Sequence, residues 1–227
     1  MLQWNSDNEL FSIMKEVLYT AVLGDILDQK GYRHQFLPPE IRPLDSKMVM
    51  AGRAMPVLER DIAAEDGSSD ASQAPFGLML DALDSLKENE IYLCSGSSPA
   101  YALIGEIMSA RAQYLGAAGL VANGYIRDTR GILKLGIACF AHGSYAQDQA
   151  PRGVVTAYRV PIQVGDVTVE PGDILFGDCD GVLAIPRSIE RQVIALAYEK
   201  ATGEKTVLNA IRSGAAAKKA FADYGIM

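Results

Sequence analysis

Two adjacent residues, Arg127 and Asp128, offer the clearest chemistry in the chain. Arginine presents a planar pair of donors that suits a carboxylate or a developing enolate, and aspartate with water molecules suits Mg²⁺ or Mn²⁺. Together the two side chains could hold a 2-oxo acid by both of its oxygens. The same dipeptide could also form only a local ion pair in a surface turn, which is its commoner role after a strand.

A glycine followed by an acid, Gly105-Glu106, lies near the start of an expected helix over 103–115. Free backbone amides and the helix dipole favour an anion at such a position. From the helix, a glycine-rich return and a short strand lead to Arg127. The segment 105–128 therefore combines an anion site, an arginine and an oxygen ligand for a metal.

Other reactive side chains indicate structural roles. A catalytic triad or a multi-histidine metal site could draw only on His34 and His142, which are far apart in the sequence. Asp178 and Asp180 bracket a cysteine and could suggest a metal, but aspartates beside glycine are ordinary turn formers. The cysteines lack the C-x-x-C pairing of zinc sites and are expected to be buried, inert thiols: Cys94, Cys139 and Cys179.

The composition excludes several classes of protein. With 227 residues, 49% of them hydrophobic and 22% charged, the chain can bury a core of its own. Its net charge of −7 and the lack of a lysine and arginine cluster argue against a nucleic acid ligand. Residues 1–16 lack signal-peptide features, and no stretch approaches the ~20 apolar residues of a membrane span. The odd, widely spaced cysteines suit a reducing compartment, so we expect a cytoplasmic protein that does not bind membranes.

Hydrophobic spacing and turn residues predict an α/β fold with a mixed sheet, because helices and strands alternate early and strands dominate later. No internal repeat or long linker divides the chain, so we expect one domain, with a helical region over 1–45, an α/β core over 46–187 and C-terminal helices over 188–227. The expected elements are helices over 8–23, 76–86 and 103–115, strands over 48–57, 91–94, 119–122, 136–141 and 154–160, a surface loop or lid over 60–75, and a β-rich unit over 161–186.

The segment 105–128 resembles the signature of the RraA-like family, which includes 4-hydroxy-4-methyl-2-oxoglutarate aldolases. Further landmarks lie before and after this segment in the order found in the family: Gly24-Asp25, A-G-R-A-M-P over 51–56, V-E-P-G-D over 169–173 and G-D-C-D-G-V over 177–182. The resemblance implies a β-rich core of the swivelling-domain type with added N- and C-terminal helices. It also implies a homotrimer or a hexamer, with active sites between subunits.

The resemblance implies roles for individual residues of the segment. Arg127 is expected to bind the substrate and Asp128 the metal, Mg²⁺ or Mn²⁺, while Glu106 falls on the family's acid at the helix start. The substrate is expected to contact the first turn of the helix at Gly105, Glu106, Ile107 and Met108. In the longer aldolases a C-terminal helix carries a glutamate that reaches the neighbouring subunit's metal waters.

Glu204 is our candidate for that glutamate, with Glu199 close enough to compete, and either residue could instead be a solvated helix acid. The sequence also departs from the family pattern. Glu106 is one methylene longer than the usual aspartate, Asn123 stands where many members have aspartate, and 129–131 lack an acid often found there. These departures bear on which substrate the chain would prefer.

The activity that the resemblance implies is a metal-dependent retro-aldol cleavage of a small 2-oxo acid. A 4-hydroxy-2-oxo acid such as 4-hydroxy-4-methyl-2-oxoglutarate would yield pyruvate, and oxaloacetate decarboxylation would be a side activity through the same enolate. The family also contains regulators that inhibit a ribonuclease by protein contact, so a binding protein without catalysis is the alternative. Those regulators are typically shorter and lack the terminal helices expected here, which favours the enzyme.

Overall fold

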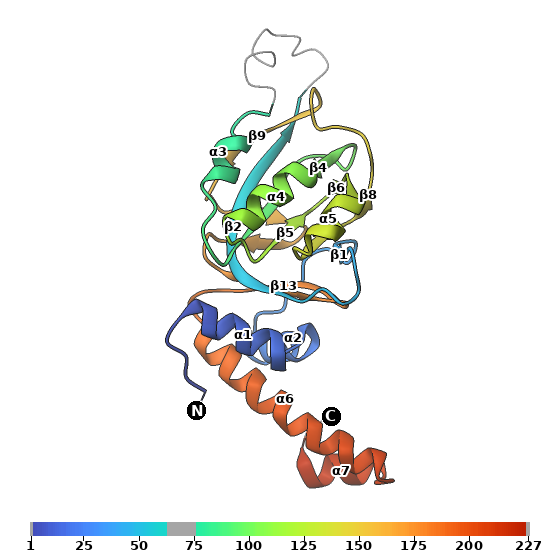
Figure 1. Ribbon diagram of the computed structural model, residues 1–227. Helices are drawn as coiled ribbons and strands as arrows, with labels where there is room; N and C mark the ends of the chain where they lie inside the picture. Colours follow the sequence, from blue (N-terminus) through green and yellow to red (C-terminus); the bar gives the residue numbers. More distant parts are fainter. Residues whose placement is uncertain (1, 63–75, 226–227) are drawn as a thin grey trace.

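A mixed β-sheet forms the centre of the computed structural model, which describes residues 2–62 and 76–225 (Figure 1). Four parallel strands form its middle and antiparallel strands flank them. In spatial order the strands are β1 (Arg42–Pro43), β7 (Cys139–Ala141), β5 (Gly119–Ala122), β3 (Glu90–Ser95), β2 (Met50–Asp61), β12 (Ile174–Asp178) and β13 (Gly181–Ile185), and β9 (Gly153–Tyr158) pairs with the second half of β2. The predicted α/β fold with a mixed sheet is confirmed.

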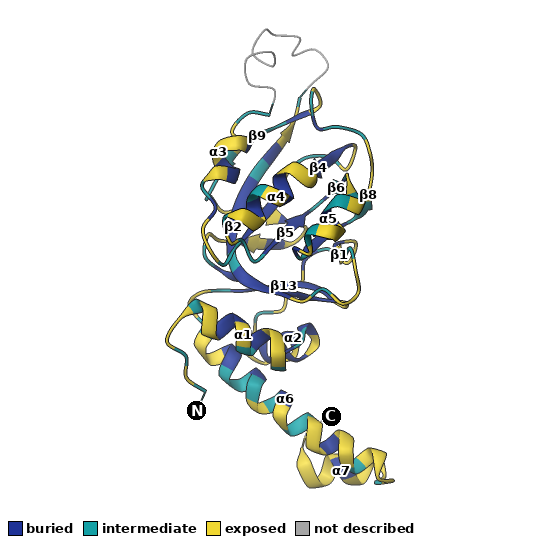
Figure 2. Cartoon of the chain, viewed as in Figure 1, coloured by how far each residue is buried: buried dark blue, intermediate teal, exposed yellow. Residues whose placement is uncertain are grey.

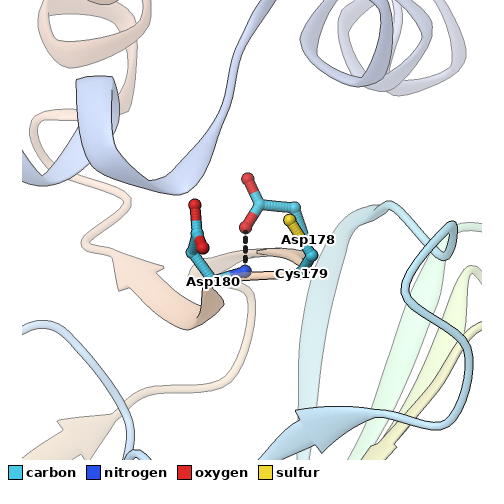
Figure 3. Close-up of side chains that lie close together, drawn as sticks. All are labelled: Asp178, Cys179 and Asp180. Atoms are coloured by element: carbon cyan, nitrogen blue, oxygen red, sulfur yellow. Dashed lines mark hydrogen bonds between the residues drawn. The ribbon is translucent and has the colours of Figure 1, made fainter.

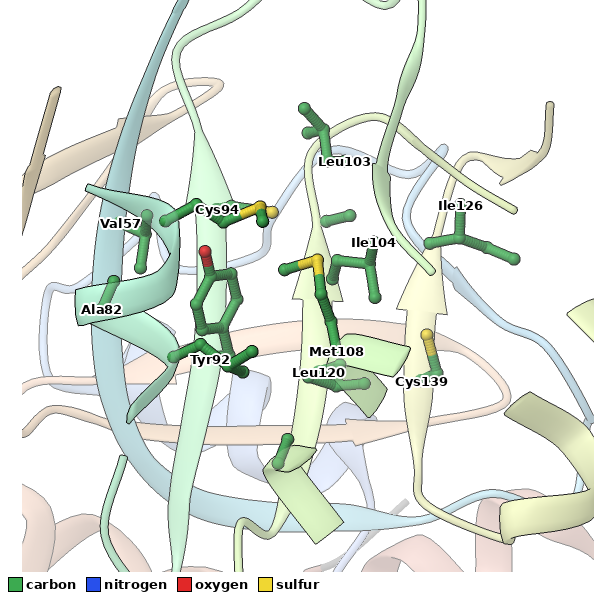
Figure 4. Packing of buried hydrophobic residues seen from close by; sticks show 14 of the residues in the cluster. Val57, Ala82, Tyr92, Cys94, Leu103, Ile104, Met108, Leu120, Ile126 and Cys139 are labelled. Atoms are coloured by element: carbon green, nitrogen blue, oxygen red, sulfur yellow. The ribbon is translucent and has the colours of Figure 1, made fainter. Parts of the chain in front are cut away.

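Both faces of this sheet are buried, as the continuous apolar runs of its strands require. Side chains alternate along β3, so Tyr92 and Cys94 face one layer and Ile91 and Leu93 face the other. The first layer packs beneath α3 (Met79–Asp84) and α4 (Glu106–Tyr114), as Figure 4 shows for Tyr92 and Ala82. The second layer faces the hairpin of β10 (Ile162–Val164) and β11 (Val167–Val169), and the sheet curls until it nearly closes into a barrel.

The terminal helices pack on the end of the sheet formed by β12 and β13. Three of them make this contact, namely α1 (Asp7–Val17), α2 (Thr20–Gln29) and the first half of α6 (Glu190–Arg212), whereas α7 (Ala217–Tyr224) packs against α6. Figure 2 shows that buried residues of α6 lie in its first half, among intermediate and exposed ones, and that α7 is mostly exposed. Among the helices of the described residues, none is long and apolar enough to cross a membrane.

The single helix predicted over 8–23 is wrong, because the chain becomes extended at Leu18 and Tyr19 and a second helix begins at Thr20. The cause is a long-range cap. The Asp178 carboxylate of β12 accepts hydrogen bonds from the backbone N–H of Thr20 at 2.8 Å and from its hydroxyl at 2.7 Å. These bonds satisfy donors at the start of α2 that would otherwise lack partners.

The helix predicted over 103–115 is confirmed only from residue 106, since Ala102–Ile104 form strand β4. This strand belongs to a small parallel sheet with β6 (Tyr125–Ile126) and β8 (Gly143–Ser144). The strand predicted over 136–141 is shortened by α5 (Thr129–Leu135), which was not predicted and ends at Gly136. The loop or lid predicted over 60–75 begins with the end of β2, and its residues 63–75 lie outside the described part of the chain.

One ion-pair network holds the terminal helices to the sheet. Arg53 of β2 pairs with Asp7 of α1 at 2.8 Å and with Glu190 of α6, and the Arg53 side chain is only 17% exposed. The hydrogen bond from Arg53 lowers the pKa of Asp7. Removing the arginine would leave two partly buried carboxylates without their cation.

We therefore expect Arg53→Met to lower the free energy of unfolding by about 2–4 kcal/mol in urea titrations. The matched control is Arg111→Met, because Arg111 of α4 pairs with Asp84 at 2.8 Å where both side chains are well exposed. That variant should lose less than about 1 kcal/mol. Equal losses in the two variants would contradict the role given to the network.

Candidate active site

Parallel pairing of β4 and β6 brings two helix N-termini together. Strand β4 leads into α4 at Gly105, and β6 leads into α5 at Asp128. The backbone N–H of Arg127 donates to the carbonyl of Ile104 at 2.9 Å, which fixes the two chain turns beside each other. Two helix starts that lie side by side favour an anion, because free N–H groups and the positive ends of the helix dipoles lie at helix N-termini.

Asp128 occupies an unusual backbone conformation at this junction. It caps the start of α5 with φ 60° and ψ 32°, in the left-handed region that non-glycine residues seldom adopt. Its Oδ2 lies 3.3 Å from the backbone N of Glu106 and 3.9 Å from Nε of Arg127. A Cβ at Gly105 would fall 2.9 Å from the same oxygen, so glycine allows the carboxylate to approach α4.

Arg127 lies between two carboxylates. Its Nη1 is 3.1 Å from Oδ1 of Asp148, and its Nε faces Asp128. All three side chains are partly exposed, so their charged groups remain accessible to a ligand. The pair is more than a surface turn, because both members line a cavity.

This cavity has a volume of about 200 Å³ and suits a small molecule. Its walls are mainly apolar and come largely from α3, β4 and α4, and a few charged and amide groups also line it. The apolar residues include Phe76, Met79, Leu83, Leu103 and Met108, and the polar side chains are Arg127, Asp128, Asp148 and Gln149. A few polar groups on an apolar wall are typical of a site that orients a small polar ligand.

The predicted contact residues at the start of α4 take different positions. Gly105, Ile107 and Met108 line the cavity, with Met108 buried and Ile107 86% exposed at its rim. Glu106 is exposed, and its carboxyl group lies over Gly131 of α5, where a Cβ would collide with it. Its backbone N–H reaches Asp128, but its side chain is not among those that line the cavity.

Glu204 is not brought to this cavity within one chain. It lies on α6, which leaves the core on the side away from α4 and α5 (Figure 1). There the Tyr19 hydroxyl donates to its carboxylate, Nζ of Lys200 is 3.7 Å away, and burial raises the pKa of Glu204. It borders a separate apolar groove with Tyr19, Val207, Leu208 and Ile211. A role at a neighbouring subunit's metal stays a prediction.

A second group of acids, Asp178 and Asp180 with Cys179, lies in the turn between β12 and β13 (Figure 3). The possible ligand atoms of the three side chains lie within 4.8 Å of one another. Both Asp178 oxygens accept hydrogen bonds, from Thr20 and from the backbone N–H of Asp180 at 2.9 Å. These bonds give Asp178 a structural role, because its carboxylate stabilises the turn and caps the start of α2.

Comparison with known proteins places this geometry in a family context. The RraA-like family model, described as Aldolase/RraA, matches residues 20–184. A Halalkalibacterium halodurans protein named "Putative 4-hydroxy-4-methyl-2-oxoglutarate aldolase" is 33% identical over 120 residues, which are 53% of this chain and 57% of that protein. "Protein DlpA" of Legionella pneumophila is 25% identical over 208 residues, 90% of this chain but 32% of that protein. The chain thus spans about half or less of the length of these relatives.

A solved structure shares the architecture. Streptomyces coelicolor RraAS2, described as an unusual member of the RNase ES inhibitor RraA protein family, superposes with a TM-score of 0.76. The match covers 90% of this chain and 98% of that chain at 22% identity, so it supports the fold alone. Because the family model covers most of the sequence and the solved structure has the same fold, the chain belongs to the RraA-like family.

Proposed function

We propose that the chain is a divalent-metal-dependent lyase that cleaves a 4-hydroxy-2-oxo acid, such as 4-hydroxy-4-methyl-2-oxoglutarate, to pyruvate. The observation that supports this proposal is the meeting of Arg127 and Asp128 with the α4 N-terminus at one cavity. Decarboxylation of oxaloacetate is the expected side activity, since it passes through the same enolate. The names of relatives at about 30% identity agree with aldolase chemistry.

The residues at the cavity fit Mg²⁺ or Mn²⁺ held by Asp128. These ions prefer oxygen ligands, and Mg²⁺ keeps several waters around one or two protein carboxylates. The Asp128 side chain is about half exposed, so it can accept an ion together with its waters. When bound, the metal supplies a Lewis acid that polarises the 2-oxo group of the substrate.

The protein's own residues bind the substrate and manage its charge. The Arg127 guanidinium binds a substrate carboxylate and offsets the negative charge that develops on the enolate oxygen as the carbon–carbon bond breaks. Free amides at the start of α4, near Gly105, hold a carboxylate. The positioning of a water that returns a proton to the enolate carbon stays a prediction for Glu106, because its carboxyl group lies over Gly131 and does not line the cavity. For 4-hydroxy-4-methyl-2-oxoglutarate, loss of the hydroxyl proton and this return leave two molecules of pyruvate.

The proposal extends to assembly as a homotrimer or a hexamer in the cytoplasm. Ile107 at the cavity rim is 86% exposed in one chain, and Leu80 of α3 is also well exposed near it. A neighbouring copy over this edge would cover both side chains. The same arrangement would allow Glu204 of a neighbour to approach the metal.

The test is release of pyruvate from 4-hydroxy-4-methyl-2-oxoglutarate and from oxaloacetate. We expect turnover to require Mg²⁺ or Mn²⁺ and to stop with a chelator. Arg127→Ala should lower kcat by about 10²–10³-fold, the usual loss when a donor to a developing oxyanion is removed. The control is Arg130→Ala, because Arg130 is an exposed arginine on the same helix start.

Two outcomes would count against the lyase. Equal turnover in the Arg127 and Arg130 variants would show that the cavity is not the site. An absence of activity on any 2-oxo acid, together with capture of a ribonuclease by the purified chain, would favour the RraA-type regulator, a binding protein without catalysis.

A further inference from the structure

A carboxyl group that the proposed reaction does not use lies directly behind the cavity. Glu59 of β2 is only 2% exposed. Nε2 of Gln149 donates a hydrogen bond to its Oε2 at 2.6 Å. Gln149 is itself 3% exposed and lines the cavity beside Asp148. One amide side chain therefore separates the Glu59 carboxyl group from the proposed substrate site.

The surroundings of Glu59 do not suit a charge. Among the described residues, its Oε1 has no hydrogen-bond partner, and neither does the buried hydroxyl of Tyr92. The titratable groups that face it are Tyr92 and Cys94 of β3 and Tyr101, none of which is cationic (Figure 4 shows the first two). Burial raises the pKa of Glu59 to about 7, although the bond from Gln149 lowers it. The carboxyl group thus changes its charge near neutral pH.

We propose that Glu59 is a positioning residue of the cavity, which holds Gln149 at the wall and in its neutral form favours binding of an anion beside Arg127. This inference rests on the proposed function, because it assumes that the ligand is a carboxylate. Asp128 and Asp148 already offset the charge of Arg127. A further negative charge behind Gln149 acts through apolar walls, where it is screened less than in water. Ionisation of Glu59 therefore weakens anion binding.

The experiment measures binding of oxalate by calorimetry in saturating Mg²⁺, between pH 6 and 8.5. Oxalate is fully ionised throughout this interval, so its own charge does not change. We expect the wild-type affinity to fall about three- to tenfold as the pH rises. Glu59→Gln keeps the shape of the side chain and an acceptor for Gln149 but cannot ionise, so its affinity should change less than about twofold.

Two further variants make the result specific. Asp61→Asn changes a carboxylate on the same strand that binds Tyr101 and Ser98 rather than Gln149, and it should behave as the wild type. Gln149→Met removes the bond that lowers the pKa of Glu59, so the fall in affinity should move to higher pH. This shift tests the inference even where Glu59→Gln fails to fold.

The inference is overturned if wild type and Glu59→Gln lose affinity in parallel, or if the wild type binds no oxalate at any pH. Failure of the proposed function is a separate result. It would appear as wild-type protein that binds oxalate with the expected pH dependence but releases no pyruvate from either substrate.

Discussion

Asp128→Asn is expected to abolish the proposed metal-dependent pyruvate release, with a loss of at least about 10³-fold in kcat/KM, because a Lewis acid would supply several kcal/mol of charge stabilisation. Asparagine is the informative replacement. It tolerates the left-handed conformation that Asp128 adopts, and its amide oxygen can still accept from the Glu106 N–H. The thermal midpoint should therefore stay within a few degrees of the wild type while activity is lost.

Asp128→Ala separates the backbone effect from the chemistry. Alanine at φ 60° is strained and should cost about 1–2 kcal/mol of stability in addition to the lost activity. The matched acid is Asp180, which is exposed in the β12–β13 turn, and Asp180→Asn should retain full turnover. An active Asp128→Asn protein, or an Asp180→Asn protein that no longer responds to metal, would move the metal site away from the cavity.

The sequence predicted residues that line the cavity best where one continuous segment carries them. Gly105 and Asp128 lie at the two ends of 105–128, and parallel pairing of β4 with β6 brings them together. The strand pairing was not predicted, since three-residue β4 and two-residue β6 carry too little periodicity to distinguish them from loops. The seven-residue α5, which contains Gly131, was missed for the same reason.

The other side of the cavity could not be read from the sequence. Asp148 and Gln149 lie in an irregular stretch after β8. An isolated β-bridge between Ala102 and Asp148 places both residues at the cavity. Only tertiary structure determines such a contact. Asn123, a departure from the family pattern, donates to Ser95 at 3.0 Å and lies 3.1 Å from Nε2 of His142, so the amide serves two partners there.

Glu59 did leave a signal in the sequence. The strand predicted over 48–57 continues to Asp61, and alternation then places Glu59 on the buried face with Val57 and Met55. An acid at a buried strand position is a reason to look for function, because its burial is unfavourable without a cation.

Glu59→Gln is expected to stabilise the protein above neutral pH, and the sign follows from proton linkage. The pKa of Glu59 is raised from 4.5 to about 7 by burial, so the folded state binds the proton more tightly than the unfolded state. Wild-type stability therefore falls as the pH rises from about 4.5 to about 7, by roughly 3 kcal/mol when the interval is crossed fully. Glutamine is neutral at every pH and avoids this loss.

Urea unfolding at pH 5 and pH 8 measures the difference. Between these values the variant should gain roughly 2–3 kcal/mol on the wild type. Asp61→Asn should show the opposite sign at lower pH, because burial raises the pKa of Asp61 but bonds from Tyr101 and Ser98 outweigh it and lower the value. Asp61 therefore contributes stability that is lost on acidification. Parallel curves for wild type and Glu59→Gln would mean that burial does not raise the pKa of Glu59 and that its carboxyl group is already charged in the folded state, and would remove the basis for its effect on anion binding.

The stability that Glu59 costs above neutral pH is consistent with a role of this residue at the cavity. An acid that destabilises the folded state above pH 7 is tolerated when it holds Gln149 in place and its neutral form favours anion binding. Binding of an anion beside Arg127 raises the pKa of Glu59 further, since the two negative charges repel. Saturating oxalate should therefore make the wild type take up protons near pH 7, and Glu59→Gln should not.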